Sequence, residues 1–186
     1  MQVLRTEVVA FATRTLSQLL TTIDTLNTCG TVAEVLAALV AGVSTEFART
    51  AIFSVKGDRL EGIQQVGLDA GSDISNLVMP LAVNSLLTRA VATRRTTLVS
   101  GGELGAAPGP FGGAPEVAAA LPVLAHGEVL AVLYADDGGR PQAQHDALEL
   151  RTKVAELLLQ VATPSLERVL SDPIAVTELR DFTNFL

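Results

Sequence analysis

Hydrophobic positions along the chain fall into two kinds of run: long ones with helical spacing and short ones that are apolar at every position. The clearest short run is Val129–Leu133, which follows an apolar run at Ala120–Ala125 and a His126-Gly127 turn. A strand that is apolar on both faces is typical of the centre of a sheet covered on both sides. Ala118–Asp137 is therefore predicted to form a β-hairpin in the middle of the sheet.

Further extended segments are predicted before this hairpin. Lys56-Gly57-Asp58-Arg59 has the composition of a tight turn between two strands. Pro80 disfavours helical backbone at the residue before it, so the segment around it is predicted to be extended. The expected strands are Thr50–Val55, Leu60–Val66, Thr96–Val99 and a short piece at Met79–Val83.

A long helix is predicted at Gln2–Asn27. Its apolar residues recur at heptad spacing and form the seam Val9, Ala12, Leu16, Leu19, Ile23 and Leu26. The helix would be roughly 40 Å long, more than a small domain needs. It either packs on its own domain or joins two copies as a coiled coil, and we favour the homodimer because the apolar surface is wide.

Three more helices are expected within the domain. Thr31 and Glu34 have the spacing of a capping box at the start of a helix that runs to about Glu46, and Gly30 before it suits a left-handed helix end. The other two are predicted at Ser85–Thr93 and Gln144–Ala162.

The C-terminal part is predicted to be jointed. Pro164 is expected to interrupt the preceding helix, with Thr163 as a new N-cap. Pro173–Leu186 has apolar residues at helical spacing and is expected to dock on the chain itself or on a partner. The predicted organisation is a dimerisation helix at 1–28, a domain at 29–163 and a helical extension at 164–186.

Composition narrows the class of protein. The 186 residues are 48% hydrophobic with a net charge of −7, which disfavours nucleic-acid binding, and the basic spot at Arg89, Arg94 and Arg95 is too small to change this. No run approaches the ~20 apolar residues that a membrane span needs, and the N-terminus lacks a signal-peptide pattern. With Cys29 as the single cysteine, a cytoplasmic protein is expected.

Residues that could carry catalysis are scattered. His126 and His145 lack metal-ligand spacing, and no phosphate-binding glycine motif is present. Asp136-Asp137 precedes two glycines and is interpreted as a solvated turn. Cys29 has no neighbouring His or Lys in sequence and is interpreted as a structural thiol. We expect no enzyme activity, no metal and no cofactor.

Gly101–Pro115 is rich in Gly and Pro and is predicted to be a loop. It is either a plain surface excursion or a flap over a cavity with Phe111 as its plug, since loops of this length are uncommon unless functional or disordered.

The order of these elements, together with AALPVLAHGEVLAVLYADD, resembles the GAF domain family of small-molecule sensors. The resemblance covers roughly Thr31–Val161 and includes Met79-Pro80-Leu81 and the segment from Ser85 to Val99. It implies an α+β, profilin- or PAS-like fold. An antiparallel sheet of five to six strands would carry the terminal helices on one face, and a short helix and loops over a pocket on the other.

The sequence departs from several members of that family. The signature of members that bind cyclic nucleotides is not recognisable. The chromophore-bearing cysteine of phytochrome relatives is absent from the pocket region, because Cys29 lies before the second predicted helix. Free methionine sulfoxide reductases share the fold but rely on several cysteines, so that activity is not expected here.

The resemblance implies a sensory or regulatory module with an unidentified small-molecule ligand and a possible partner signalling protein. The candidate ligand-binding residues are Phe53, Arg89, Phe111 and Tyr134. The alternative is a structural dimerisation or adaptor protein whose pocket is filled by its own side chains. An enzyme would have to depend on Cys29 or His126.

Overall fold

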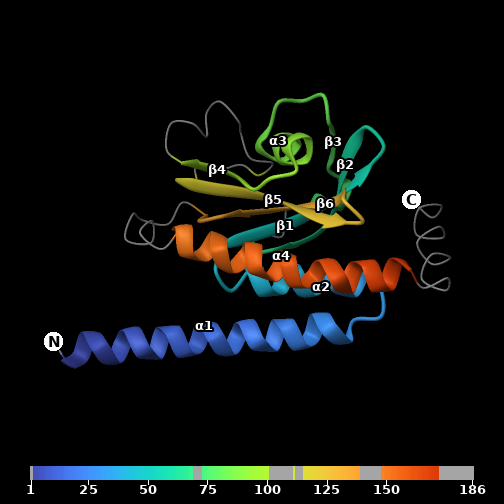
Figure 1. The fold of residues 1–186 in the computed structure, drawn as a ribbon. Coiled ribbons are helices and arrows are strands. Elements are labelled where there is room, and N and C mark those ends of the chain that lie inside the picture. The colour runs from blue at the N-terminus through green and yellow to red at the C-terminus, as the bar shows by residue number, and fades with distance from the viewer. Residues whose placement is uncertain (1, 69–72, 101–110, 112–114, 139–147, 172–186) are drawn as a thin grey trace.

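The computed structural model describes residues 2–68, 73–100, 111, 115–138 and 148–171, with side chains from residue 13 in the first helix and from residue 149 in the last (Figure 1). The helices are α1 (Gln2–Thr28), α2 (Val32–Val43), α3 (Leu86–Thr93) and α4 (Leu148–Leu170), with a 3-10 turn η1 (Ile74–Asn76). The strands are β1 (Arg49–Lys56), β2 (Arg59–Val66), β3 (Val78–Pro80), β4 (Thr97–Ser100), β5 (Val117–Ala125) and β6 (Glu128–Asp136).

The strands form one antiparallel six-stranded sheet in the order β3-β2-β1-β6-β5-β4. The predicted hairpin is confirmed as its centre, because β6 lies between β1 and β5 and is buried from Ala131 to Asp136. His126 and Gly127 make the turn with φ of 50° and 78°. Positive φ at both central residues is what a two-residue type I′ turn requires.

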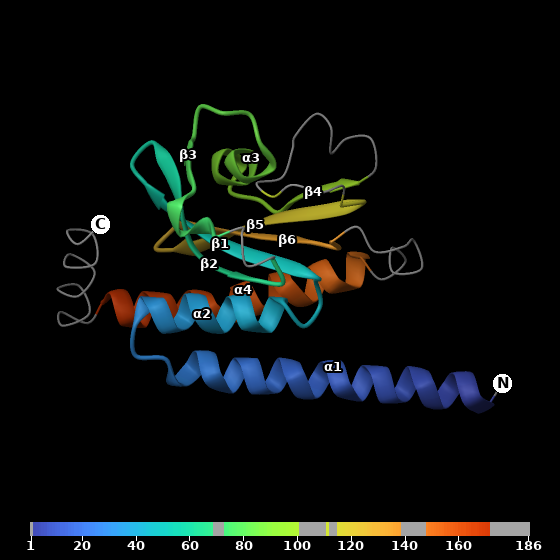
Figure 2. The same ribbon diagram turned by 180° about the vertical axis from the view of Figure 1, so that it is seen from behind.

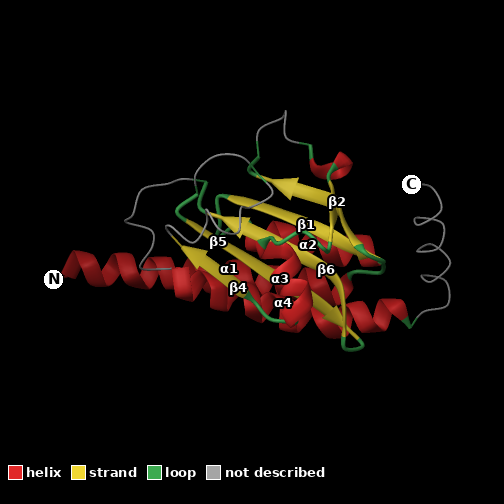
Figure 3. Ribbon diagram, turned by 90° about the horizontal axis from the view of Figure 1, so that it is seen from above, coloured by secondary structure: helices red, strands yellow, loops and turns green. Residues whose placement is uncertain are grey.

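Helices cover the sheet unequally. Figures 1 and 2 show α2 and α4 against one face, α1 as a further layer beyond them, and α3 on the opposite face. The view from above shows the strands lying across this helical layer (Figure 3). Successive strand residues face opposite sides, so two cores form: Ile52, Leu121 and Leu133 lie in the one on the α2 and α4 side. The predicted α+β architecture is confirmed.

The C-terminal half of α1 packs on the domain, whereas residues nearer its N-terminus are exposed. Leu26 is fully buried and Leu19 and Ile23 pack against the core shared with α2 and α4. Leu26 therefore has no surface left for a partner, in contrast to its expected place in a dimer seam. Leu16 keeps 62% of its surface exposed, and the N-terminal part of α1 projects past the rest of the domain (Figure 1).

The first helix end differs from the prediction, whereas the next helix start agrees with it. The capping box is confirmed: the Glu34 amide donates to Thr31 Oγ1, and the Thr31 amide donates to the Glu34 carboxylate. Gly30 is not left-handed. Its amide instead donates to Glu34 Oε2 at 2.7 Å, so the carboxylate that caps α2 also fixes the residue before it.

The predicted break at Pro164 is wrong, because α4 runs through it from Leu148 to Leu170. The predicted boundary between 163 and 164 thus falls inside a helix. Proline removes the amide that would bond to the carbonyl of Gln160, and both residues face solvent. Ala162 and Leu166 are fully buried on the other side, so core packing holds the helix together.

Several predicted features lie outside the described residues. They are His145, the Gly-rich segment apart from Phe111 and Pro115, and the C-terminal segment from residue 172 onward. Val9 and Ala12 lie in α1, but their side chains are not among those described. Within the described residues, no helix combines the length and the apolar character that crossing a membrane demands.

Candidate functional site

Three of the four predicted ligand residues come together on the α3 side of the sheet. Phe53 from β1 and Tyr134 from β6 are fully buried, and Phe111 is 9% exposed. The Phe111 ring centroid lies 5.2 Å from that of Tyr134, edge to face, and 6.2 Å from that of Phe53. Phe111 thus fills the space between two strands and α3 with its own ring.

Arg89 does not join this cluster. It is an exposed residue of α3, whereas the neighbouring Leu86, Leu87 and Ala90 are fully buried beneath the helix. Arg89 therefore lies apart from the other three candidate ligand residues.

A buried charged network lies beside the aromatic cluster, where the sequence predicted a solvated turn. Asp136 is completely buried and Asp137 is 4% exposed. Arg49 Nε and Nη2 donate to Asp136 Oδ1 and Oδ2, each at 2.7 Å. Asp136 also accepts from the Tyr134 hydroxyl at 2.7 Å and from the Gly138 amide at 2.8 Å. The carboxylate is thereby bonded on both oxygens, as a buried charge requires.

Burial and charge fix the protonation of this network. Burial, and then the charge of Asp136, raise the pKa of Tyr134 far above its ordinary value. The hydrogen bond to Asp136 likewise raises the pKa of Arg49. The phenol therefore stays a neutral donor and the guanidinium stays charged at physiological pH.

The pairing of β1 with β6 would have predicted this network, had the strand register been known. Arg49 lies directly opposite Asp136 in the β1–β6 pairing, and Arg49, Ala51 and Phe53 share one strand face. Opposite charges at facing positions of neighbouring strands predict a pair. The sequence alone does not give this register, because it is set by tertiary structure. Locally, the two glycines that follow Asp136 and Asp137 indicate a turn.

The α3 side of the sheet is therefore a packed apolar and aromatic layer, and the Tyr134 hydroxyl at its edge is bonded to Asp136. Among the described residues, no three His, Cys, Asp or Glu side chains are grouped so that they could hold a metal ion.

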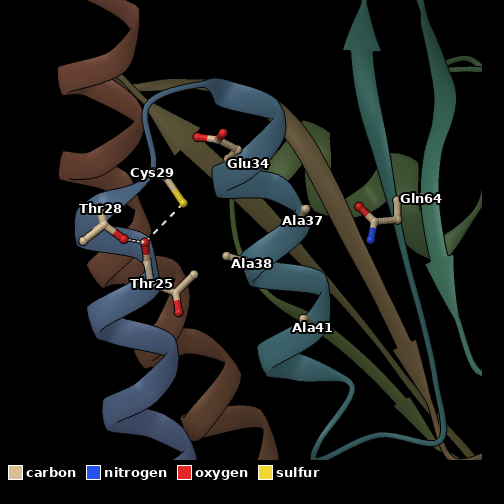
Figure 4. A pocket seen from close by; sticks show the side chains of 8 residues that line it. All are labelled: Thr25, Thr28, Cys29, Glu34, Ala37, Ala38, Ala41 and Gln64. Carbon is tan, nitrogen blue, oxygen red and sulfur yellow. Dashed lines mark hydrogen bonds between the residues drawn. The ribbon is translucent and has the colours of Figure 1, made fainter.

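A second hollow lies on the helical side. It is an open groove of about 590 Å³ between α1, α2 and β2, and Figure 4 shows its walls. The thiol of Cys29 donates to the Thr25 carbonyl at 3.2 Å. Burial, and then the nearby Glu34, raise the pKa of Cys29, so the thiolate is disfavoured. The residues lining the groove are Thr25, Thr28, Cys29, Glu34, Ala37, Ala38, Ala41 and Gln64.

The β5–β6 turn connects the two sides of the sheet. Arg94, which ends α3, donates to the Gly127 carbonyl at 2.9 Å and to Glu128 at 2.8 Å. The His126 amide donates to Glu167 of α4 at 2.9 Å. Arg94 and His126 have φ of 55° and 50°, and they are the two non-glycine residues with positive φ in the described part of the chain.

Comparison with known proteins identifies the fold. No protein-family profile matches the chain, and no curated protein matches it either. Solved structures do match. The GAF domain of an Acinetobacter phosphoenolpyruvate-protein phosphotransferase has a TM-score of 0.57 at 15% identity, over 79% of this chain and 93% of that one.

Two other matches have different established roles. The photosensory core module of a Stigmatella aurantiaca phytochrome has a TM-score of 0.66 at 13% identity, over 94% of this chain and 40% of that one. Free methionine-R-sulfoxide reductase from Neisseria meningitidis has a TM-score of 0.55 at 17% identity, over 81% of this chain and 88% of that one. The chain has a GAF-like fold, which these proteins use for different purposes.

Proposed function

We propose that the chain is a non-catalytic regulatory module that senses a small molecule on the α3 face of its sheet and acts as a homodimer through α1. The observation that carries this proposal is the β5–β6 turn. Arg94 on the sensing side and Glu167 on the helical side both bond to this one turn. A ligand that shifts α3 would therefore act on the position of α4.

Features of α1 favour the homodimer. Leu16 and Leu20 are 62% and 61% exposed on one side of the helix, four residues apart and hence on neighbouring turns. Exposed large apolar side chains that line up along a helix are typical of an interaction surface. The helix also extends beyond the domain that it packs on (Figure 2).

The placement of Cys29 supports a non-catalytic role. The sequence contains one cysteine, and it lines the groove of the helical side, on the far side of the sheet from Tyr134. Its raised pKa disfavours the thiolate. Neither Cys29→Ala nor His126→Ala is expected to lower the rate in any turnover assay.

A second candidate function is favoured by Phe111. Since its ring packs against Phe53 and Tyr134, the expected pocket is occupied by the chain itself. A structural adaptor that binds partner proteins through its helices needs no ligand and would have this arrangement.

A thermal-shift screen separates the two candidates. A compound that binds the folded state raises the melting temperature by mass action. A sensor is expected to be stabilised by some nucleotide or small metabolite in a broad library. If none stabilises it while the chain remains dimeric, the adaptor function replaces the sensor.

A further inference from the structure

The groove between α1, α2 and β2 has small side chains on its helical walls. Ala37, Ala38 and Ala41 line it from α2, where Glu34 adds a carboxylate, and Thr25 and Thr28 line it from α1 (Figure 4). Small residues on two neighbouring helices leave room that large side chains of another segment can fill.

The sheet side of this groove is formed by β2. Gln64 lines it from β2. Val66, two residues along the same strand, shares that face and is 38% exposed. The groove is therefore a concave, partly apolar surface that the described residues leave open to solvent.

The last described turn of the chain lies at one end of the groove. Arg168 of α4 donates to the carbonyls of Cys29 at 2.8 Å and Asn27 at 3.3 Å. The end of α4 is thus held against the α1–α2 connection, where Cys29 forms part of the groove wall. Whatever follows Ser171 begins next to this wall.

Residues 172–186, which lie outside the described part of the chain, have the composition of a docking segment. Their sequence places Ala175, Leu179, Phe182 and Leu186 at helical spacing, with Phe185 beside them. An isolated helix of this length is marginal in water, so its apolar face needs a surface to pack on. The first eight residues after Ser171 can span about 26 Å when extended. The α2 wall from Glu34 to Ala41 is about 10 Å long, so the segment is long enough to bring Phe182 and Phe185 onto it.

We propose that the C-terminal segment docks in cis into the α1–α2–β2 groove, with Phe182 and Phe185 against the alanines of α2. Three observations agree on this occupant: alanines and threonines make up most of the groove's lining, with Glu34 and Gln64 as its only long side chains among the described residues; the segment supplies large apolar side chains; and the segment starts at the groove's end. Docking covers the 6% of Cys29 that remains exposed and adds the C-terminal segment to the helical layer. This inference does not depend on a ligand or on the dimer.

Cys29 provides the test, because it is the single cysteine and it lines the groove. The reaction rate of its thiol with a disulfide reagent is measured in the full chain and in a Phe182→Ser/Phe185→Ser variant. A docking free energy of about 1.4 kcal/mol leaves the groove open about one tenth of the time and slows the reaction about tenfold. The variant is therefore expected to react about ten times faster than wild type. An Asn184→Ser variant, which changes a polar residue of the same segment, is the matched control and is expected to react at the wild-type rate.

Adding a synthetic peptide of residues 172–186 to the double variant distinguishes docking from general loosening of the fold. The peptide is expected to restore slow labelling in a saturable manner. Equal rates in wild type and variant, or a fast rate that the peptide does not reverse, would overturn the proposal. Protection that grows with protein concentration would also overturn it, since the occupant would then be the segment of a second copy.

Discussion

Arg49 and Asp136 face each other across β1 and β6 and are joined by two hydrogen bonds of 2.7 Å each. Asp136 is fully buried, while the Arg49 side chain keeps 16% of its surface exposed. The pair anchors the edge of the aromatic cluster, because Asp136 also holds the hydroxyl of Tyr134.

Replacing Asp136 by Asn is expected to lower the free energy of unfolding by about 3 kcal/mol, because the guanidinium of Arg49 loses its buried counter-charge. Urea denaturation measures the loss. The same substitution at the exposed Asp58 of the β1–β2 turn is the control and is expected to change stability by less than about 0.5 kcal/mol. A loss at Asp136 as small as that at Asp58 would mean that the pair has no structural role.

Tyr134 gives the protein a defined sensitivity to alkali. Its pKa is raised in the folded state relative to the ordinary value of 10.0, so the unfolded chain loses the proton first. The contribution of the neutral Tyr134 phenol to the free energy of unfolding is therefore complete below about pH 10 and decreases as the pH rises above it. Since this is the only tyrosine, phenolate absorbance is expected to appear only together with loss of helical circular dichroism.

A Tyr134→Phe variant provides the comparison. It is expected to be less stable at neutral pH by about 1 to 3 kcal/mol, because Asp136 loses a buried donor. Above about pH 10 its stability is expected to fall less steeply than that of wild type. Phenolate formation in a protein that remains folded would contradict the assigned burial.

The β5–β6 turn is expected to couple Arg94 and Glu167 although the two side chains are bonded to different residues of it. A double-mutant cycle with Arg94→Ala and Glu167→Ala is expected to show a coupling energy of about 0.5 kcal/mol, since both bonds restrain one turn. The magnitude is small because both bonds are exposed to solvent. Arg94→Ala combined with Lys153→Ala, which lies on α4 away from the turn, is expected to be additive. Additivity in both cycles would remove the proposed link between the faces.

Pro164→Ala is expected to raise the free energy of unfolding by about 1 to 3 kcal/mol, because alanine restores the helical amide that proline lacks. Thermal unfolding measures the gain. Gln160→Ala, at another exposed position of α4, is the control and is expected to change stability by less than about 0.5 kcal/mol. Destabilisation by Pro164→Ala would show that the proline itself is needed for the path of α4.

Local sequence patterns predicted the features that depend on nearby residues. The turn at His126-Gly127 and the capping box of Thr31 and Glu34 were predictable, because each requires residue types at short fixed spacing. The central position of β6 was predictable because its apolar residues occupy both faces.

Features that depend on distant residues were not predictable in the same way. Asp136 precedes two glycines, and its burial depends on Arg49, which is 87 positions away. Pro164 follows the local rule for a helix break, but packing of α4 against the core prevails. A heptad pattern likewise cannot tell a partner from the chain's own helices, so Leu26 was placed in a dimer seam although it belongs to the core.

The dimer through α1 is the claim on which the regulatory account depends, since a signal that reaches the helices needs a partner helix to move against. Light scattering tests it most directly, on wild type and on a Leu16→Asp/Leu20→Asp variant whose substitutions fall on exposed side chains. A Gln18→Asp/Thr21→Asp variant, on another exposed side of α1, is the matched control. Wild type and control are expected to have twice the mass of one chain, and the leucine variant the mass of one, because buried unpaired carboxylates disfavour the interface. A monomeric wild type, or a leucine variant that keeps the wild-type mass, would contradict the account.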